Sequence, residues 1–390
     1  MRLLLLLFTT FLFSFACNPS QETNPTITLG ASQFEEYIPL LKNKNVGLVV
    51  NQTSVIGNTH LVDTLLSLGV EVRSIFAPEH GFRGVADAGE HVQDGIDTKT
   101  GVSIISLYGE HKKPTTDDLL DIDVIIFDIQ DVGVRFYTYI STMHYVMEAC
   151  AEQNKKFIVL DRPNPNGHYV AGPVLDLTYK SFVGMHPIPI VHGLTVGELA
   201  QMINGEGWMK NNVKCDLSVI KMKNYTHETP YSLPIKPSPN LPNDRSIALY
   251  PSLCLLEPTI MSIGRGTSFP FQVVGYPDST YGNFVFTPVS TEGASKYPKH
   301  QDKNCYGEDL RINSNDSNFT LKWIIKYYQK YNSTAFITSE NFFDKLAGNS
   351  TLRTQLKEGM LEKDIEATWQ DDLNIYLKKR SNYLLYVDFK

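Results

Sequence analysis

The sequence predicts an α/β protein: a doubly wound, mostly parallel sheet followed by a second, smaller α/β domain. First, apolar runs of strand length alternate with amphipathic helical segments from Asn45 onward. Second, these runs are continuously apolar, which is typical of strands buried on both faces of a parallel sheet. Third, a chain of 390 residues, 42% of them hydrophobic, is long enough for more than one domain.

The first predicted elements follow one another in strand–helix–strand order. Residues 45–51 (NVGLVVN) form an apolar run of strand length. Residues 60–69 carry leucines at helical spacing and stop at Gly69, a residue type that commonly ends helices. Residues 70–76 (VEVRSIF) predict the next strand.

The strongest strand pattern of the chain is IDVIIFDIQ, residues 122–130. Farther on, Thr195 and Glu198 have the spacing of a capping box, which predicts that a helix begins there. The other predicted elements are a helix over residues 141–153 and strands over 156–161 and 215–222.

A proline-rich stretch over residues 229–246 interrupts this alternation. From about Ser268 the pattern becomes mixed strand and helix, with helical segments such as LKWIIKYYQKY. We therefore place the first domain at residues 29–267 and the smaller α/β domain at residues 268–390.

The N-terminus has the layout of a secretory signal, with one Arg, an apolar run over residues 3–15 and Cys17 at the expected cleavage point. The run is too short for a comfortable membrane span. The pattern resembles the bacterial lipoprotein signal, in which that Cys is lipidated; a plain signal peptide with an incidental Cys17 is the alternative. We expect an exported protein of the periplasm or cell envelope, attached to a membrane through a lipid on Cys17, with residues 18–28 as a linker.

Composition and motifs argue against several classes of protein. The net charge is −7 and no long basic run occurs, which argues against a nucleic-acid partner. No Cys or Cys/His pattern has metal-ligand spacing, so no metal site is expected. The four cysteines after Cys17, which are Cys150, Cys215, Cys254 and Cys305, could pair in an exported chain, but free thiols are expected because Cys150 and Cys215 fall in apparently buried elements. No G-x-G-x-x-G follows the first strand and no G-x-S-x-G occurs, so neither a cofactor nor a serine nucleophile is predicted.

Polar segments follow several of the predicted strands. In a doubly wound sheet, ligands bind beyond the carboxyl ends of the strands, which lie along one edge. We therefore expect four polar segments to meet at that edge: Asn51, the loop that carries Glu79, residues 128–139 and residues 161–166.

Glu79 is the first candidate for chemistry, because it stands between Pro78 and Gly81 directly after a strand. Proline favours an extended residue before it, and glycine permits a sharp bend. A carboxyl group on such a turn suits a general acid or base. His80 lies beside it, Glu90 is a rival for the same role, and a plain turn residue that caps the following helix is the alternative.

The segment FDIQDVGVRFYTYIST is the second candidate region. If it is extended, Arg135, Tyr137 and Tyr139 share one face and could bind an anionic sugar or a carboxylate. A surface strand with a salt bridge is the alternative. The other candidate site residues are Asp128, Gln130 and Asp131 in the same segment, Arg162, Asn164 and Asn166 after the next strand, and Arg265 between two glycines.

These residues predict a polar cleft that carries carboxylates and arginines, but they do not select a reaction. Two classes of protein remain open. One is a hydrolase that acts on a polar substrate of the cell envelope, and the other is a lipoprotein that only binds a carbohydrate.

Seven motifs occur here in the order seen in the NamZ-type exo-β-N-acetylmuramidases: APEHGFRG, DIQDVGVRFYTY, LDRPNPNG, HGLTVGELA, SPNLP, SIGRGTSFPF and KHQDKNC. The chain resembles this family from about Leu29 to the C-terminal NYLLY. The resemblance implies a Rossmann-like catalytic domain, a smaller α/β domain and an active site in the cleft. The implied reaction removes N-acetylmuramic acid from the non-reducing end of peptidoglycan fragments by cutting its β-1,4 bond to N-acetylglucosamine, as part of cell-wall turnover.

The resemblance also implies roles for single residues. Glu79 becomes the expected general acid, and His80 would orient it or bind a hydroxyl group. Asp128, Asp131 or Glu90 would supply the second carboxylate, unless the 2-acetamido group of the substrate replaces it.

Muramic acid carries a lactyl carboxylate, for which the candidate partners are Arg135, Arg162 and Arg265. One departure from the family is that Pro258 and Ile260 stand where relatives commonly have Gly and Asn. An amidase or peptidase that acts on the stem peptides is a weaker third class, since it would more naturally show a metal or nucleophile motif.

Overall fold

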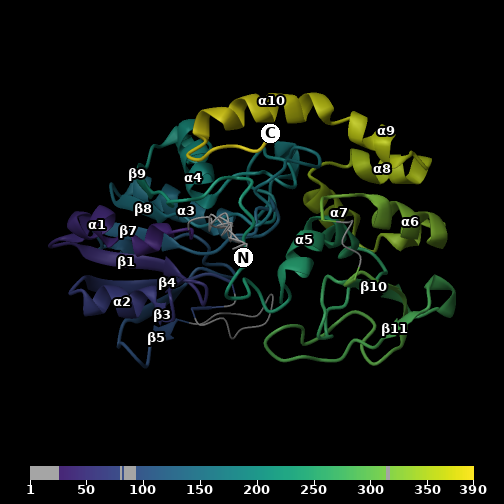
Figure 1. The fold of residues 1–390 in the computed structure, drawn as a ribbon, viewed down its shortest axis with the longest axis horizontal. Helices are drawn as coiled ribbons and strands as arrows, with labels where there is room; N and C mark the ends of the chain where they lie inside the picture. The colour runs from purple at the N-terminus through teal and green to yellow at the C-terminus, as the bar shows by residue number, and fades with distance from the viewer. Residues whose placement is uncertain (1–25, 80, 83–93, 313–316) are drawn as a thin grey trace, which may run out of the picture.

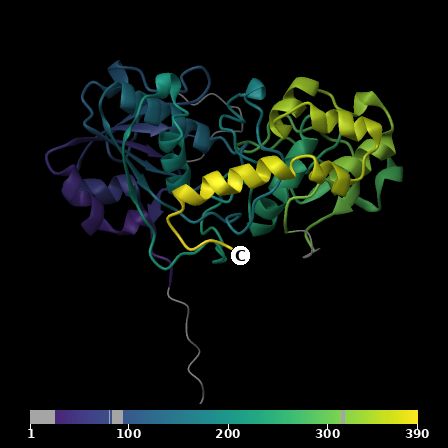
Figure 2. The ribbon, with the colours of Figure 1, turned by 90° about the horizontal axis from the view of Figure 1, so that it is seen from above.

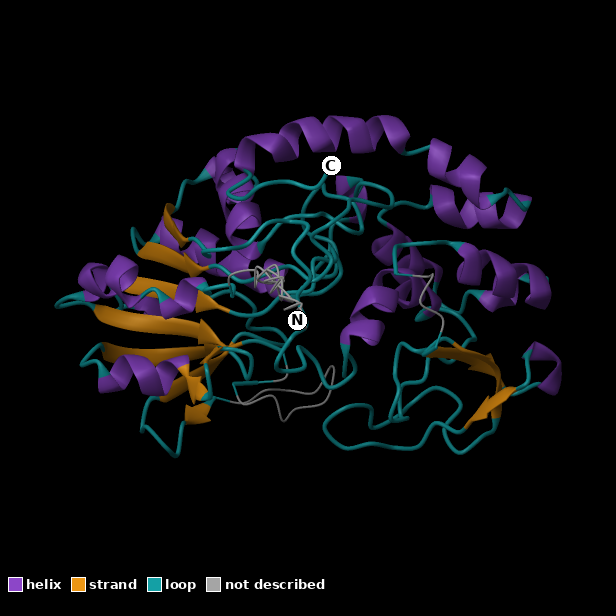
Figure 3. Ribbon diagram, in the orientation of Figure 1, coloured by secondary structure: helices purple, strands orange, loops and turns teal. Residues whose placement is uncertain are grey.

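The computed structural model describes residues 26–79, 81–82, 94–312 and 317–390. It consists of a larger lobe around a seven-stranded sheet and a smaller lobe around a three-stranded sheet (Figure 1, Figure 3). None of the described helices combines the length and the apolar character needed to cross a membrane.

The large sheet has the strand order β5-β6-β4-β1-β7-β8-β9. All of its neighbouring strands pair in parallel except β5 and β6, which are antiparallel. The strands are β1 (Asn45–Val50), β4 (Glu71–Ala77), β5 (Gly95–Ile96), β6 (Ser103–Ser106), β7 (Val124–Asp128), β8 (Lys156–Leu160) and β9 (Asp216–Ile220). A short hairpin of β2 (Val55–Ile56) and β3 (Thr59–His60) follows β1. The predicted α/β fold with a mostly parallel sheet is confirmed.

Helices cover both faces of this sheet (Figure 1). These helices are α1 (Phe34–Tyr37), α2 (Leu61–Ser67), α3 (Tyr139–Glu152) and α4 (Val196–Gly205). The next helix, α5 (Asp244–Leu253), lies away from the sheet, beside the smaller lobe (Figure 1). The predicted capping box is present at the start of α4, where the Thr195 hydroxyl accepts from the Glu198 amide and the Glu198 carboxylate accepts from the Thr195 amide.

The strands are buried on both faces, as their apolar sequences predict. In β7, Ile125 and Phe127 belong to the core cluster that contains the α3 and α4 side chains. Val124 and Ile126 belong to the cluster that contains the α2 side chains. Successive residues of a strand point to opposite faces, so both sets must be apolar when both faces are covered.

The smaller lobe contains β10 (Val273–Tyr276), β11 (Phe284–Phe286) and β12 (Cys305–Asp309), with β12 in the centre and both pairs antiparallel. Its helices are α6 (Lys322–Tyr331), α7 (Glu340–Ala347), α8 (Thr351–Glu358), α9 (Glu362–Ala367) and α10 (Gln370–Arg380). The predicted second, smaller domain is therefore present, while its boundary after residue 267 stays a prediction. Cys150, Cys215, Cys254 and Cys305 are buried free thiols.

The chain returns to the larger lobe at its C-terminal end, where α10 runs from one lobe to the other (Figure 2). The Tyr376 hydroxyl donates to the backbone oxygen of His192 over 2.6 Å. The buried Arg380 donates to the backbone oxygen of Gly193 and pairs with Asp388. Both contacts fasten the last helix to the larger lobe.

Arg135 makes a second connection between the lobes, and the prediction that it binds substrate is wrong. Its fully buried guanidinium donates to four backbone oxygens, those of Pro173, Ile188, Leu346 and Ala347, at 2.6 to 2.9 Å. Leu346 and Ala347 end α7, where carbonyl groups lack partners within the helix. Arg135 therefore uses its two Nη groups to satisfy backbone oxygens, and its Nε is buried without a hydrogen-bond partner among the described residues. The side chain is fully buried and does not line the cavity described below, so it is not placed to bind a ligand there.

The structure predicts that Arg135→Met lowers the free energy of unfolding by at least about 3 kcal/mol, because four buried oxygens lose their donor. Urea denaturation measures this change. The matched control is Arg311→Met, since Arg311 forms an exposed ion pair with Asp309 that should contribute less than about 1 kcal/mol. Equal losses in both variants would contradict the role of Arg135.

Candidate active site

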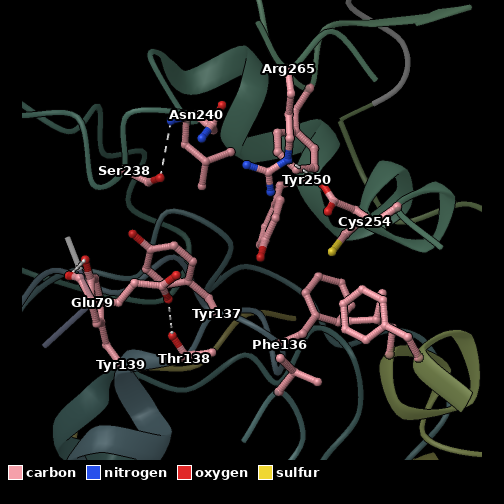
Figure 4. A pocket seen from close by; sticks show the side chains of 16 residues that line it. Glu79, Phe136, Tyr137, Thr138, Tyr139, Ser238, Asn240, Tyr250, Cys254 and Arg265 are labelled. Atoms are coloured by element: carbon pink, nitrogen blue, oxygen red, sulfur yellow. Dashed lines mark hydrogen bonds and ion pairs between the residues drawn. The ribbon is translucent and has the colours of Figure 1, made fainter. Parts of the chain in front are cut away.

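A cavity of about 190 Å³ opens where the two lobes meet. Its walls come from the turn after β4 (Glu79), the segment that leads into α3 (residues 136–139), several residues between 238 and 271, and helix α7. Figure 4 shows the side chains that line it, with Glu79 on one side and Arg265 on the other. The cavity therefore places an acidic group and a basic group on opposite walls.

Glu79 lies at the carboxyl end of β4, as predicted, in a turn closed by a hydrogen bond from the Gly81 amide to the Pro78 oxygen. Two hydroxyl groups donate to its carboxylate. Tyr108 reaches Oε1 and Thr138 reaches Oε2, each over 3.0 Å. Because each oxygen has its own donor, the carboxylate is held in one orientation at the cavity wall.

Tyr108 and Thr138 were not identified from the sequence. Burial and, next, the charge of Glu79 raise the pKa of the Tyr108 phenol, so this group keeps its proton and remains a donor. Thr138 directly precedes Tyr139, the first residue of α3. The strand end and the helix start together fix the carboxylate.

Arg265 forms the opposite wall together with Glu257, which the sequence analysis missed. Arg265 Nε donates to Glu257 Oε1 over 2.6 Å, and the guanidinium lies 5.0 Å from the centre of the Phe271 ring. Burial alone would lower the pKa of Arg265, but the charge and hydrogen bond of Glu257 raise it above its ordinary value. The arginine is therefore charged, and Glu257 holds it through its Nε atom.

Residues of the KHQDKNC motif hold the segment that contains Glu257. The Lys299 ammonium donates to the backbone oxygens of Glu257 and Thr259, and His300 Nε2 lies 2.6 Å from the backbone oxygen of Ile260. Pro258 and Ile260, the positions that depart from the family pattern, lie in this same segment. The motif thus holds the backbone of the segment that supplies Glu257 to the cavity wall.

Aromatic side chains form much of the remaining surface of the cavity. Tyr137 packs edge-on against Tyr139 and Tyr250, with ring centres 5.0 Å and 6.1 Å apart. The prediction that Arg135, Tyr137 and Tyr139 share one face of an extended segment is wrong, because Tyr139 begins α3. Both tyrosines nevertheless line the cavity, as expected for residues that contact a ligand.

Asn240 of the SPNLP motif also lines the cavity and was not singled out in the sequence. Its side chain is 2% exposed and donates from Nδ2 to the backbone oxygen of Ala294 over 2.7 Å. Its Oδ1 has no hydrogen-bond partner among the described residues. A ligand N–H or hydroxyl group in the cavity could supply that partner.

Asp128 and Arg162 do not line the cavity, which corrects their predicted roles in catalysis and substrate binding. Arg162 donates to both carboxylate oxygens of Asp128, over 2.5 Å and 2.9 Å. The two side chains are 0% and 4% exposed. The pair is therefore a buried contact between the ends of β7 and β8, and neither residue is available to a sugar.

Five further predicted site residues lie at the carboxyl edge of the sheet but turn their side chains to the protein itself. Asn51 accepts a hydrogen bond from the Thr53 amide, and Asp131 accepts one from the Gly133 amide. The other three side chains donate to backbone oxygens: Gln130 to those of Asp131 and Pro163, Asn164 to that of Leu194, and Asn166 to that of Val132. Burial raises the pKa of Asp131 to about 7. The structure does not bring these five residues to the cavity.

Three other predicted residues, His80, Glu90 and Cys17, lie outside the described residues. In the described part of the chain, no group of three or more His, Cys, Asp or Glu side chains is placed to hold a metal ion.

The sequence and the fold match known proteins. Models of the N-terminal and C-terminal regions of the exo-beta-N-acetylmuramidase NamZ match residues 46–245 and 248–386 of this chain. The chain belongs to this family, which confirms the resemblance seen in the motifs.

Individual relatives are similar over nearly their whole length. The chain is 41% identical over 374 residues to the peptidoglycan beta-N-acetylmuramidase NamZ of Bacillus subtilis (strain 168), covering 90% of this chain and 89% of the relative. Two crystal structures of DUF1343 family proteins from Bacteroides fragilis superpose with TM-scores of 0.87 and 0.81, at 47% and 31% identity. They cover 93% and 92% of this chain, which covers 100% and 99% of theirs.

The geometry predicts that Asp128→Asn mainly affects stability. The change leaves the buried Arg162 without its counter-charge and should lower the free energy of unfolding by about 3–5 kcal/mol. Chemical denaturation measures it, with Glu71→Gln in the exposed Glu71–Arg73 pair as a control that should cost less than about 1 kcal/mol. A variant of normal stability would show that Asp128 is not a structural residue.

Proposed function

We propose that this protein is an exo-β-N-acetylmuramidase that removes terminal N-acetylmuramic acid from the non-reducing end of peptidoglycan fragments. The observation that carries the proposal is the oriented carboxylate of Glu79 in a cavity whose far wall carries Arg265. The family of the chain and its 41% identity to a peptidoglycan beta-N-acetylmuramidase support it.

Glu79 acts as the general acid in this proposal. Cleavage of a glycosidic bond requires a proton on the leaving oxygen while positive charge develops on the sugar ring. The hydroxyl groups of Tyr108 and Thr138 fix both carboxylate oxygens, so that the acid faces one position in the cavity. His80 would orient Glu79 or bind a hydroxyl group of the sugar.

Two of the three carboxylates that were predicted to assist Glu79 are not placed to do so. Asp128 is paired with Arg162, and Asp131 does not line the cavity. Glu257 lines it but holds Arg265. The reaction is then completed either by Glu90 or by the 2-acetamido group of the substrate.

The aromatic residues and Asn240 serve binding. Tyr137, Tyr139 and Tyr250 offer flat apolar surface to a sugar ring. Asn240 Oδ1, which lacks a donor among the described residues, would accept from the acetamido N–H or a sugar hydroxyl.

We further propose that the protein is exported to the cell envelope and anchored by a lipid on Cys17. The signal-like residues 1–17 support this location. Labelling cells with a tagged fatty acid would mark the wild-type protein and leave a Cys17→Ala variant unmarked. Equal labelling of both would contradict the anchor.

Purified protein that lacks residues 1–17 should release the chromophore from 4-nitrophenyl β-N-acetylmuramide and not from the matching β-N-acetylglucosaminide. Glu79→Gln should keep the fold, because the amide oxygen can still accept a hydrogen bond, and should reduce kcat by about 10²–10⁴-fold. Glu358→Gln, at the exposed end of α8, is the control with unchanged kcat. A near-normal rate in Glu79→Gln would reject this assignment, and affinity without turnover in the wild type would favour a carbohydrate-binding lipoprotein.

Thr138 is expected to act as a positioning residue. Thr138→Val removes the donor to Glu79 Oε2 and should lower kcat by about 10–100-fold, with little change in KM. Thr138→Ser keeps a hydroxyl group and should restore most of the rate. If the Ser and Val variants were equally slow, the hydroxyl group would not be what matters.

A further inference from the structure

Of the three arginines considered for an anionic substrate, one remains available. Arg135 gives its guanidinium to four backbone oxygens, and Arg162 gives its own to Asp128. Both are almost completely buried. Arg265 lines the cavity, and 29% of its side chain is exposed.

The contacts of Arg265 leave one edge of its guanidinium open. Glu257 binds Nε, and the Phe271 ring covers one face of the group. Among the described residues, no protein group forms a hydrogen bond with either Nη atom of Arg265. Figure 4 shows Arg265 beside Tyr250 on the side of the cavity away from Glu79. A held arginine with a free Nη edge is suited to bind a carboxylate.

The charges around the cavity favour an anion at this wall. Glu257 balances Arg265, and the ammonium of Lys299, which donates to the Glu257 backbone oxygen over 2.9 Å, adds a positive charge. Burial lowers the pKa of Lys299 to about 8, so this group is mostly charged at neutral pH. On the opposite wall, the Glu79 carboxyl group offers no positive charge to an anion. A ligand with one carboxylate is therefore bound in one direction, with the carboxylate at Arg265.

We propose that Arg265 determines substrate specificity by binding the lactyl carboxylate of the terminal N-acetylmuramic acid, and that Glu257 positions Arg265 for this contact. The inference rests on the proposed function. N-Acetylglucosamine has a hydroxyl group where muramic acid has the lactyl ether, so it leaves the Nη edge unpaired. A site built to pair a polar group of its substrate rejects an analogue that lacks it far more strongly than an apolar pocket rejects a missing methylene.

The test compares two substrates with two variants. The substrates are 4-nitrophenyl β-N-acetylmuramide with its free carboxylate and the same glycoside with the lactyl group as its neutral methylamide. The wild type should prefer the acid by about 100-fold or more in kcat/KM. Arg265→Met should reduce kcat/KM for the acid to near that for the amide and leave the amide rate almost unchanged. The preference of Arg265→Lys for the acid should lie between those of the wild type and Arg265→Met, because an ammonium group cannot bind a carboxylate through two parallel N–H groups as a guanidinium does.

The matched control is Arg353→Met. Arg353 also has 29% of its side chain exposed and pairs with Asp344, but it lies on α8 outside the cavity. It should keep the wild-type preference. The proposal would be overturned if Arg265→Met lowered kcat/KM for the acid and the amide by the same factor, or if it left the preference for the acid unchanged.

A binding measurement separates this inference from the proposed function. Calorimetry with free N-acetylmuramic acid and its methylamide measures how much the carboxylate contributes to binding, without any hydrolysis. If the wild type hydrolyses neither glycoside but binds the acid more tightly than the amide, and Arg265→Met removes that difference, the carboxylate contact holds while the enzymatic function fails. If binding does not distinguish acid from amide, the role of Arg265 is rejected.

Discussion

The shape of the cavity depends on the buried guanidinium of Arg135. It joins two loops of the larger lobe to the C-terminal end of α7, and α7 supplies Phe342 and Leu346 to the cavity wall. Burial lowers the pKa of Arg135 to about 9, and the negative end of the α7 dipole favours the charged form there. A Cβ at Gly348, whose φ is +84°, would come within 2.6 Å of Arg135 Nη2. The end of α7 can therefore approach the arginine this closely only with a glycine at position 348. One apolar cluster also runs through both lobes, from Phe127 and the α3 side chains to α6 and α7.

Most of the polar and charged side chains at the carboxyl edge of the large sheet hold the scaffold, and only a few line the cavity. Loops at the carboxyl edge of a parallel sheet contain many backbone groups without partners, and side chains such as Gln130, Asn164 and Asn166 satisfy them. Asp128 and Arg162 neutralise each other in the same layer. Glu79, Glu257 and Arg265 line the cavity, where Tyr108 and Thr138 hold Glu79 and Glu257 holds Arg265.

Much of the larger lobe could be predicted because its strands are local, continuous apolar runs. The short strands β5 and β6 were missed, since they contain only two and four residues. Glu79 could be found because Pro78 and Gly81 mark its turn in the sequence. Glu257 could not, because the groups that define its role are distant: Lys299 and His300 bind its segment from about 40 residues away. The reading of Arg135 failed because alternation along a segment does not reveal whether it is extended.

The central claim is that one sugar spans the cavity, with its reactive carbon at Glu79 and its carboxylate at Arg265. A crystal structure of the wild-type protein with N-acetylmuramic acid bound tests this claim directly. The lactyl carboxylate should lie within hydrogen-bond distance of the Arg265 Nη atoms, and the C1 hydroxyl should lie within reach of the Glu79 carboxyl group. A sugar bound in the opposite direction, or outside this cavity, would contradict it.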